Sequence, residues 1–189
     1  MRMICGPALS GLALAFSCGG PAAAHDVDLS LNSHAVRVSY GTPVGDGLRL
    51  EGGWLHDSDE GDVAHAGVLV TGSVAPANQK LTGGVGVRLA YLAGEGNDRE
   101  GYALGVGGAL RWSVPRNDRL AVSGEWYWAP DILSGGDSTK YVDGTVRVGY
   151  RVLPQAEVYV GARYVGADYD NRPSIRFDTG MHAGFNLRF

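Results

Sequence analysis

From Asp26 onward, long stretches of the chain alternate between apolar residues and residues that are small or polar. Val36 and Val38, for example, are separated by Arg37. A period of two residues places successive side chains on opposite faces of an extended strand, so it predicts β-strands with two chemically different faces. No helical period is found there. The alternation continues through residues 48–51, 85–91, 102–114, 120–128, 142–152, 158–164 and 177–189.

The lengths and faces of these strands favour a membrane barrel over a soluble β-sandwich. They extend over about 10 to 14 residues, whereas soluble strands usually have about 5–6 and tilted membrane strands about 9–11. One face is nearly free of charge, and the other carries Arg, Glu, Asp, Gly, Ser and Thr. A membrane barrel turns its apolar face to lipid and its polar face to the lumen. We therefore predict an all-β, closed antiparallel up-and-down transmembrane β-barrel.

Residues 1–24 predict a cleaved signal peptide, and residues 25–189 are expected to form the barrel. Arg2 provides a positive start, residues 4–18 are apolar, and small residues precede a cleavage site before His25. A transmembrane helix is the alternative, but several prolines and glycines would weaken it. Together with the predicted barrel, the signal peptide indicates export to an outer membrane.

Both cysteines of the chain, Cys5 and Cys18, lie within that signal segment. The mature chain is therefore expected to have no disulfide and no cysteine-based metal or catalytic site. Cys18 as a lipid-acceptor is disfavoured, because the bulky Phe16 stands where a lipidation signal has a small residue. The net charge of −4 argues against nucleic acid as a partner.

The sequence leaves the number of strands between ten and eight. Nine alternating segments can be identified, but both ends of the chain should lie on the periplasmic side, which needs an even number. We favour ten strands, with Asp26–Leu31 and Ala35–Gly41 as a hairpin that turns at Asn32-Ser33-His34. If part of this N-terminal region lies outside the barrel, eight strands remain.

Two kinds of connection are expected between the strands. Short turns that contain proline are assigned to the periplasmic side, and longer acidic loops to the extracellular side. The prolines are Pro43, Pro76, Pro115 and Pro154. The acidic connections are Asp57–Asp62, Gly94–Glu100, Pro130–Ser138 and Asp168–Ser174.

Large aromatic residues fall on the apolar face near the predicted strand ends. Tryptophan and tyrosine favour the membrane interface, because the ring prefers hydrocarbon while the polar atom prefers water. An aromatic girdle is therefore predicted from Trp54, Tyr91, Tyr102, Trp112, Trp126, Trp128 and Tyr150.

The last eight residues alternate up to a final phenylalanine. This pattern is typical of the signal that the bacterial outer-membrane assembly machinery recognises, so that machinery is the partner expected during biogenesis. The residues predicted to form the signal are Gly184, Phe185, Leu187 and Phe189.

The polar face carries more arginines than carboxylates, which predicts a basic lumen. Because unpaired buried charges are costly, each carboxylate is expected to bridge an arginine, and about five arginines would face water or anions. The predicted lumenal arginines are Arg37, Arg49, Arg88, Arg111, Arg119, Arg147, Arg151, Arg163, Arg176 and Arg188. The predicted carboxylates are Glu51, Glu125, Asp143, Glu157 and Asp178, with His65 and His182 as hydrogen-bonding histidines.

No metal, cofactor or catalytic site is predicted. The acidic run 57–62 lacks the late bidentate glutamate of a calcium loop, so we expect a solvated loop that at most bridges to lipopolysaccharide phosphates through divalent ions. A barrel protease would pair His56 with Asp57, but adjacent strand residues point to opposite faces. A lipid-deacylating barrel would need a serine two residues after His182, where Gly184 stands.

Several short motifs of the mature chain form a pattern shared with known small barrels. They are Gly53-Trp54-Leu55-His56, Gly101-Tyr102-Ala103-Leu104, Gly107-Gly108, Tyr127-Trp128-Ala129-Pro130-Asp131, Tyr159-Val160-Gly161-Ala162-Arg163-Tyr164 and the terminal Phe189. On these motifs, which span roughly His25 to Phe189, the chain resembles the YfaZ family of outer-membrane proteins. The resemblance implies an outer-membrane barrel in a Gram-negative cell, and it implies little about activity.

Three functions remain open, in this order. A structural or interaction barrel is expected first, because paired charges can plug the lumen. A narrow diffusion channel is the alternative, and rings of arginine would give it anion preference. An outer-membrane enzyme comes last. Outer-membrane lipid and lipopolysaccharide are the expected surroundings and partners.

Overall fold

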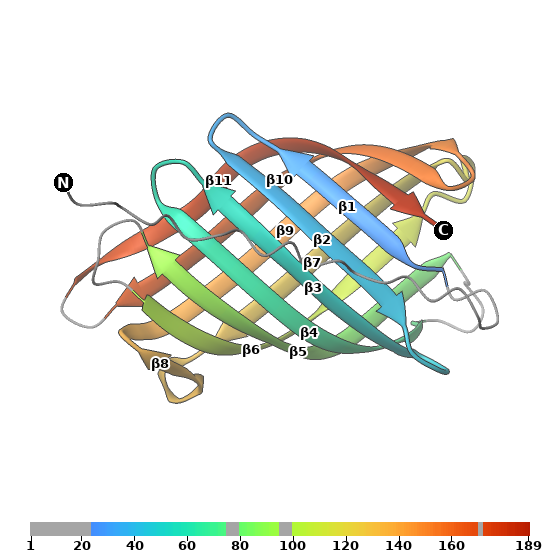
Figure 1. Ribbon diagram of the computed structural model, residues 1–189. Coiled ribbons are helices and arrows are strands. Elements are labelled where there is room, and N and C mark those ends of the chain that lie inside the picture. Colours follow the sequence, from blue (N-terminus) through green and yellow to red (C-terminus); the bar gives the residue numbers. More distant parts are fainter. Residues whose placement is uncertain (1–23, 75–79, 95–99, 170–171) are drawn as a thin grey trace, which may run out of the picture.

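The computed structural model describes residues 24–74, 80–94, 100–169 and 172–189, and these residues are mostly β-strand (Figure 1). The predicted signal peptide lies outside the described residues, except for Ala24. Among the described residues, no helix is long and apolar enough to cross a membrane. The elements are β1 (Asp26–Leu31), β2 (Ala35–Pro43), β3 (Leu48–Asp57), β4 (Gly61–Ser73), β5 (Leu81–Gly94), β6 (Glu100–Ser113), β7 (Leu120–Ala129), η1 (Asp131–Leu133), β8 (Ser134–Gly136), β9 (Ser138–Leu153), β10 (Ala156–Tyr169) and β11 (Arg172–Arg188).

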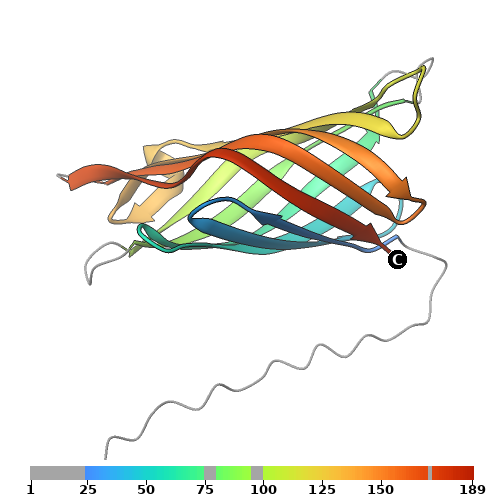
Figure 2. The ribbon, with the colours of Figure 1, turned by 90° about the horizontal axis from the view of Figure 1, so that it is seen from above.

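Ten of these strands form a closed antiparallel ring. Each strand pairs with its neighbours along the chain, β7 pairs with β9, and β1 pairs with β11 from Asp26 opposite Arg188 to Leu31 opposite Ala183. Figures 1 and 2 show β1 and β11 side by side at this closure. The prediction of ten strands, with the first two as a hairpin, is confirmed.

The short strand β8 is an addition to the ring. It pairs with the first residues of β6, Gly101 to Ala103, whereas β7 pairs with β6 only from Val106 onward. β8 therefore continues the wall at the point where β7 ends.

The two ends of the barrel differ, and we name them by the residues they hold. At the terminal end, the backbones of His25 and Phe189 exchange two hydrogen bonds of 2.9 Å, and the turns at residues 44–47, 114–119 and 154–155 lie there. The loop end holds the connections at residues 32–34, 58–60 and 130–137.

The expected length is wrong for two of the four acidic connections. Only residues 58–60 separate β3 from β4, because both strands keep their hydrogen-bond ladder up to the pair of Asp57 with Gly61. β10 and β11 likewise extend to the pair of Tyr169 with Arg172. The connection at 130–137 is long as expected, and it contains η1 and β8. Pro76 and residues 95–99 lie outside the described residues.

Exposure separates the two faces as the alternation predicts. The seven predicted girdle aromatics lie on the outside of the barrel, where they are between 41% and 58% exposed. Trp54, Tyr91 and Tyr102 share one row of directly paired residues, which runs through Ala64 of β4. This row lies toward the loop end, as an interfacial girdle requires.

Phe177 is an exception, and its predicted place on the lipid face is wrong. The register between β10 and β11 shifts, so that Val165 pairs with Asp178 but Ala167 pairs with Ile175. This irregularity changes the phase of the alternation, and Phe177 and Asp178 are both buried inside the barrel.

A pair of facing glycines lies where β5 and β6 are close to the backbone of their other neighbours, β4 and β7. Gly86 of β5 lies opposite Gly107 of β6. A Cβ on Gly107 would meet the backbone of Trp126 and Tyr127 at distances far inside contact. The neighbouring strand is thus close enough to exclude any side chain there.

We predict that Gly107→Ala destabilises the barrel by about 1–3 kcal/mol, because backbone atoms must move to admit the methyl group. Gly124→Ala is the matched control, since its Cβ would meet its nearest atoms at 3.6 and 3.9 Å. Urea unfolding in lipid vesicles measures both. Equal stability of the two variants would contradict the close approach.

Candidate functional site

The centre of the lumen holds an ionic network around Arg88 of β5. Its guanidinium forms ion pairs with Glu51 at 2.5 Å, Asp143 at 2.7 Å and Glu125 at 3.3 Å. The same group lies over the ring of Tyr127, 3.8 Å from the centroid. Only 1% of the Arg88 side chain is exposed, so carboxylates and an aromatic face replace water around this cation.

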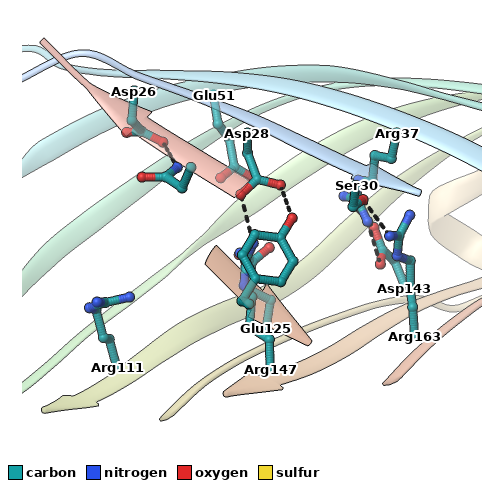
Figure 3. A network of polar contacts seen from close by, with 12 residues as sticks. Asp26, Asp28, Ser30, Arg37, Glu51, Arg111, Glu125, Asp143, Arg147 and Arg163 are labelled. Carbon is teal, nitrogen blue, oxygen red and sulfur yellow. Dashed lines mark hydrogen bonds and ion pairs between the residues drawn. The ribbon is translucent and has the colours of Figure 1, made fainter. Parts of the chain in front are cut away.

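The network continues from Arg88 in two directions. Arg37 of β2 shares Asp143 with Arg88, at 3.2 Å. Arg147 of β9 shares Glu125, at 2.5 Å, and reaches Asp28 of β1 at 3.1 Å. Figure 3 shows Arg37 beside Asp143, and Asp28 and Glu125 beside Arg147. The network therefore ties opposite walls of the barrel together.

Three further ion pairs lie beside the network. Arg163 pairs with Asp178 at 3.0 Å, Arg49 with Asp26 at 2.6 Å, and Arg111 with Glu157 in a two-pronged contact. Each of the five carboxylates assigned to this face from the sequence thus bonds to an arginine.

The predicted excess of lumenal arginine is too large. Arg119 and Arg176 are exposed, the first in the 114–119 turn and the second beside the register shift of β11. The sequence reasoning also missed Asp26 and Asp28, although they alternate with Val27 and Leu29 and so lie on the polar face of β1. Six arginines therefore pair with seven carboxylates, and the paired interior is close to neutral.

An apolar layer fills the lumen on the loop-end side of the network. Its most buried members are at most 2% exposed: Leu55, Val63, Ala90, Leu92, Ala103, Ala129, Tyr141, Val165, Ile175 and Phe177. Sequence reasoning missed this layer. The available signal was the run Leu89-Ala90-Tyr91-Leu92, in which both faces are apolar at a strand end.

Cavities lie on both sides of these layers. At the terminal end, a cavity of about 390 Å³ is lined by charged and small side chains that include Asp28, Arg111 and Arg188. At the loop end, a separate cavity of about 460 Å³ is lined by residues 32–34, the 57–60 turn and β11. A space of about 70 Å³ lies within the network itself.

The histidines fall into two groups. His65 and His182 are buried in the lumen, at 8% and 4% exposure, and His182 packs edge-on against Tyr159. His56 bonds to Asp62 across the β3–β4 hairpin at 2.9 Å, rather than to Asp57. Among the described residues, no three His, Cys, Asp or Glu side chains are placed to hold a metal ion.

The C-terminal residues of β11 divide between the two faces. Phe185, Leu187 and Phe189 lie outside, where they are between 39% and 58% exposed. Gly184 lies inside, and a Cβ there would be 2.5 Å from the Tyr159 hydroxyl oxygen. That hydroxyl donates to Asp28 at 2.6 Å, so Gly184 leaves the room in which Tyr159 joins the network.

Comparison with known proteins gives two matches over most of the chain. The model of the family described as YfaZ precursor matches residues 5–189. The outer membrane protein YfaZ of Escherichia coli (strain K12) is 34% identical over 157 residues, which cover 82% of this chain and 81% of that protein. The predicted family and the outer-membrane location are confirmed.

We predict that Glu51→Ala and Glu125→Ala each lower the stability of the barrel by about 1–3 kcal/mol, because each leaves buried arginine donors without an acceptor. Asp46→Ala, in the exposed 44–47 turn, is the control and should change stability by less than about 0.5 kcal/mol. Thermal unfolding followed by circular dichroism measures all three. Unchanged unfolding of both glutamate variants would argue against the network as a stabilising element.

Proposed function

The chain belongs to the YfaZ family of outer-membrane proteins, and we propose that it is a closed barrel with a structural or interaction role, without transport or catalysis. This proposal rests on one observation: two different barriers lie one after the other along the lumen. The ionic network occupies the centre, and the apolar layer covers it toward the loop end. A solute would have to displace both.

The two barriers resist different solutes. Hydrated ions lose water when they enter an apolar constriction, so the layer around Phe177 and Tyr141 opposes them. Polar molecules that pass this layer would meet Arg88, whose carboxylate partners come from three other strands. Together the two barriers support the proposal that the lumen is filled like the core of a soluble protein and does not conduct solutes.

A narrow diffusion channel is the second candidate. The cavity of about 390 Å³ at the terminal end favours it, because it extends into the barrel as far as Glu51 and Glu125. Because the paired ionic network is close to neutral, anion preference is not proposed for the centre of the lumen. We propose no catalytic function. His65 and His182 are buried in the space within the network, which Arg37, Arg88 and Arg163 also line.

The loop end offers a surface for contacts outside the cell. We assign the terminal end to the periplasm and the loop end to the exterior, where Asp59 and Asp62 bond to the exposed His34 and His56. Carboxylates at this level would approach lipopolysaccharide phosphates through shared divalent cations. Lipopolysaccharide is therefore the proposed neighbour at the loop end, and the assembly machinery is the proposed partner of residues 184–189.

We predict that the wild-type barrel, reconstituted in a planar lipid bilayer, gives no stepwise conductance. Phe177→Ala removes a ring from the apolar layer and should give brief openings. Tyr164→Ala is the matched control, because it removes an aromatic ring from the lipid face, where Tyr164 is 41% exposed. Regular conductance steps from the wild type would overturn the proposal of a closed lumen and favour the channel.

We also predict that deletion of Phe189 prevents insertion, because the assembly machinery requires the final aromatic residue. The shortened chain should accumulate in the periplasm, where proteases degrade it. Ile132→Ala, which changes an apolar residue that is 89% exposed at the other end, should insert normally. Membrane fractionation and heat-modifiable gel migration measure the outcome, and normal insertion of the deletion variant would refute the signal.

A further inference from the structure

One arginine that lines the cavity at the terminal end, Arg188, forms no ion pair with a described residue. Four arginines line it, and Arg49, Arg111 and Arg147 each bond to a carboxylate. Arg188 lines the same cavity but forms no side-chain ion pair or hydrogen bond within the part of the chain that the structure describes. Its guanidinium thus keeps its donors available to a ligand.

Five carboxylates and four arginines line this cavity, and each of those carboxylates is bonded to an arginine. Positive charge without a bonded carboxylate lies at the mouth, around Arg188. The charged groups near enough to act on it are Arg111, Arg151, Glu157 and Asp26. Glu157 is already engaged by both prongs of Arg111, and Asp26 is held by Arg49. The carboxylates near Arg188 are therefore neutralised by other arginines, while Arg188 and Arg151 add positive charge.

The adjoining turn extends this positive region. Arg119 lies beside Arg151, whose backbone N–H donates to the Arg119 carbonyl oxygen at 2.7 Å. Arg116 is exposed in the same turn. Positive charge around a concave mouth raises the local concentration of anions and guides them inward.

Hydroxyl groups complete the wall of the cavity. Thr82 of β5 and Ser123 of β7 lie directly opposite Arg111 on the two neighbouring strands, and both line the cavity. Arginine forks with nearby hydroxyls are suited to the oxygens of a tetrahedral oxyanion.

We propose that this cavity, with Arg188 as its principal donor, binds a small oxyanion of the phosphate class from the terminal side. The cavity volume of about 390 Å³ exceeds that of a bare phosphate, so a phosphate monoester with a small organic group also fits. Binding requires access from one side only, so it is compatible with a lumen that does not conduct.

Isothermal titration of the purified, folded barrel in a nonionic detergent tests the site, with inorganic phosphate and glycerol phosphate as probes. The wild type should bind one equivalent of either probe. Arg188→Gln should weaken binding by about tenfold or more, since it removes a charged donor. Arg176→Gln is the matched control, because it removes the same charge at the loop-end cavity, and it should bind within about twofold of the wild type.

Thr82→Glu provides a second test that leaves both arginines in place. It adds a carboxylate on the strand directly opposite Arg111, and that carboxylate should compete with the ligand and weaken binding about tenfold. Heat-modifiable migration establishes that each variant is folded, and if Arg188→Gln does not fold, Thr82→Glu decides alone.

Three results would overturn the proposal. They are the absence of saturable binding to the wild type, unchanged binding in a folded Arg188→Gln or Thr82→Glu variant, and equal weakening in Arg176→Gln. The last result would mean that overall charge, rather than this cavity, attracts the anion. Binding of glycerol phosphate without binding of inorganic phosphate would also count against a site built for the oxyanion.

Discussion

The pairing of β1 with β11 is the interaction on which the rest of the structure depends. Hydrocarbon offers no partner to a free backbone N–H or carbonyl, so an open sheet edge cannot lie in a membrane. Six residue pairs, from Asp26 with Arg188 to Leu31 with Ala183, join the two edges. Once the ring of ten strands is closed, its lumen is narrow enough for side chains to fill. The polar face of every strand then becomes part of a protein core, and the apolar face becomes the lipid contact.

A polar core of this kind explains the use of arginine. The chain has only two lysines, Lys80 and Lys140, and both lie near the barrel ends, where each faces an exposed aspartate. Arg88 instead meets three carboxylates from three strands, which the wide, planar guanidinium fork permits and a single ammonium does not. Glycines supply the room for these long side chains. A Cβ on Gly41 would collide with the Arg49 guanidinium, and one on Gly149 would collide with the Glu157 carboxylate.

The features that sequence could predict are those that depend on local alternation. The strand positions and the outward aromatics follow from a period of two, because the backbone itself imposes it. The count of ten also needed the condition that both ends of the chain lie on one side of the membrane. Phe177 and Arg176 could not be placed, because the register shift opposite Val165 changes the phase, and pairing between strands decides where a shift occurs. Arg119 was misplaced for a simpler reason, since it lies in a turn. Sequence could predict which carboxylates face the lumen, but not which of them bond to Arg88. Contacts across a lumen depend on which strands face each other.

Exposure of the charged side chains to water increases along the lumen from the centre to the terminal end. The exposed fraction of the side chain rises from 1% at Arg88 and 3% at Asp143 to 13% at Glu51 and 22% at Glu125. It reaches 25% at Arg111 and 30% at Arg49, which line the terminal cavity. The apolar layer shields the network on the loop-end side, so water reaches it chiefly from the terminal side. Ion pairs strengthen as water is excluded, which makes the dry end of the network rigid and closed. At the terminal end, arginine side chains remain hydrated and can exchange their partners. An arginine there can bind a soluble anion without breaking the ion pairs around Arg88.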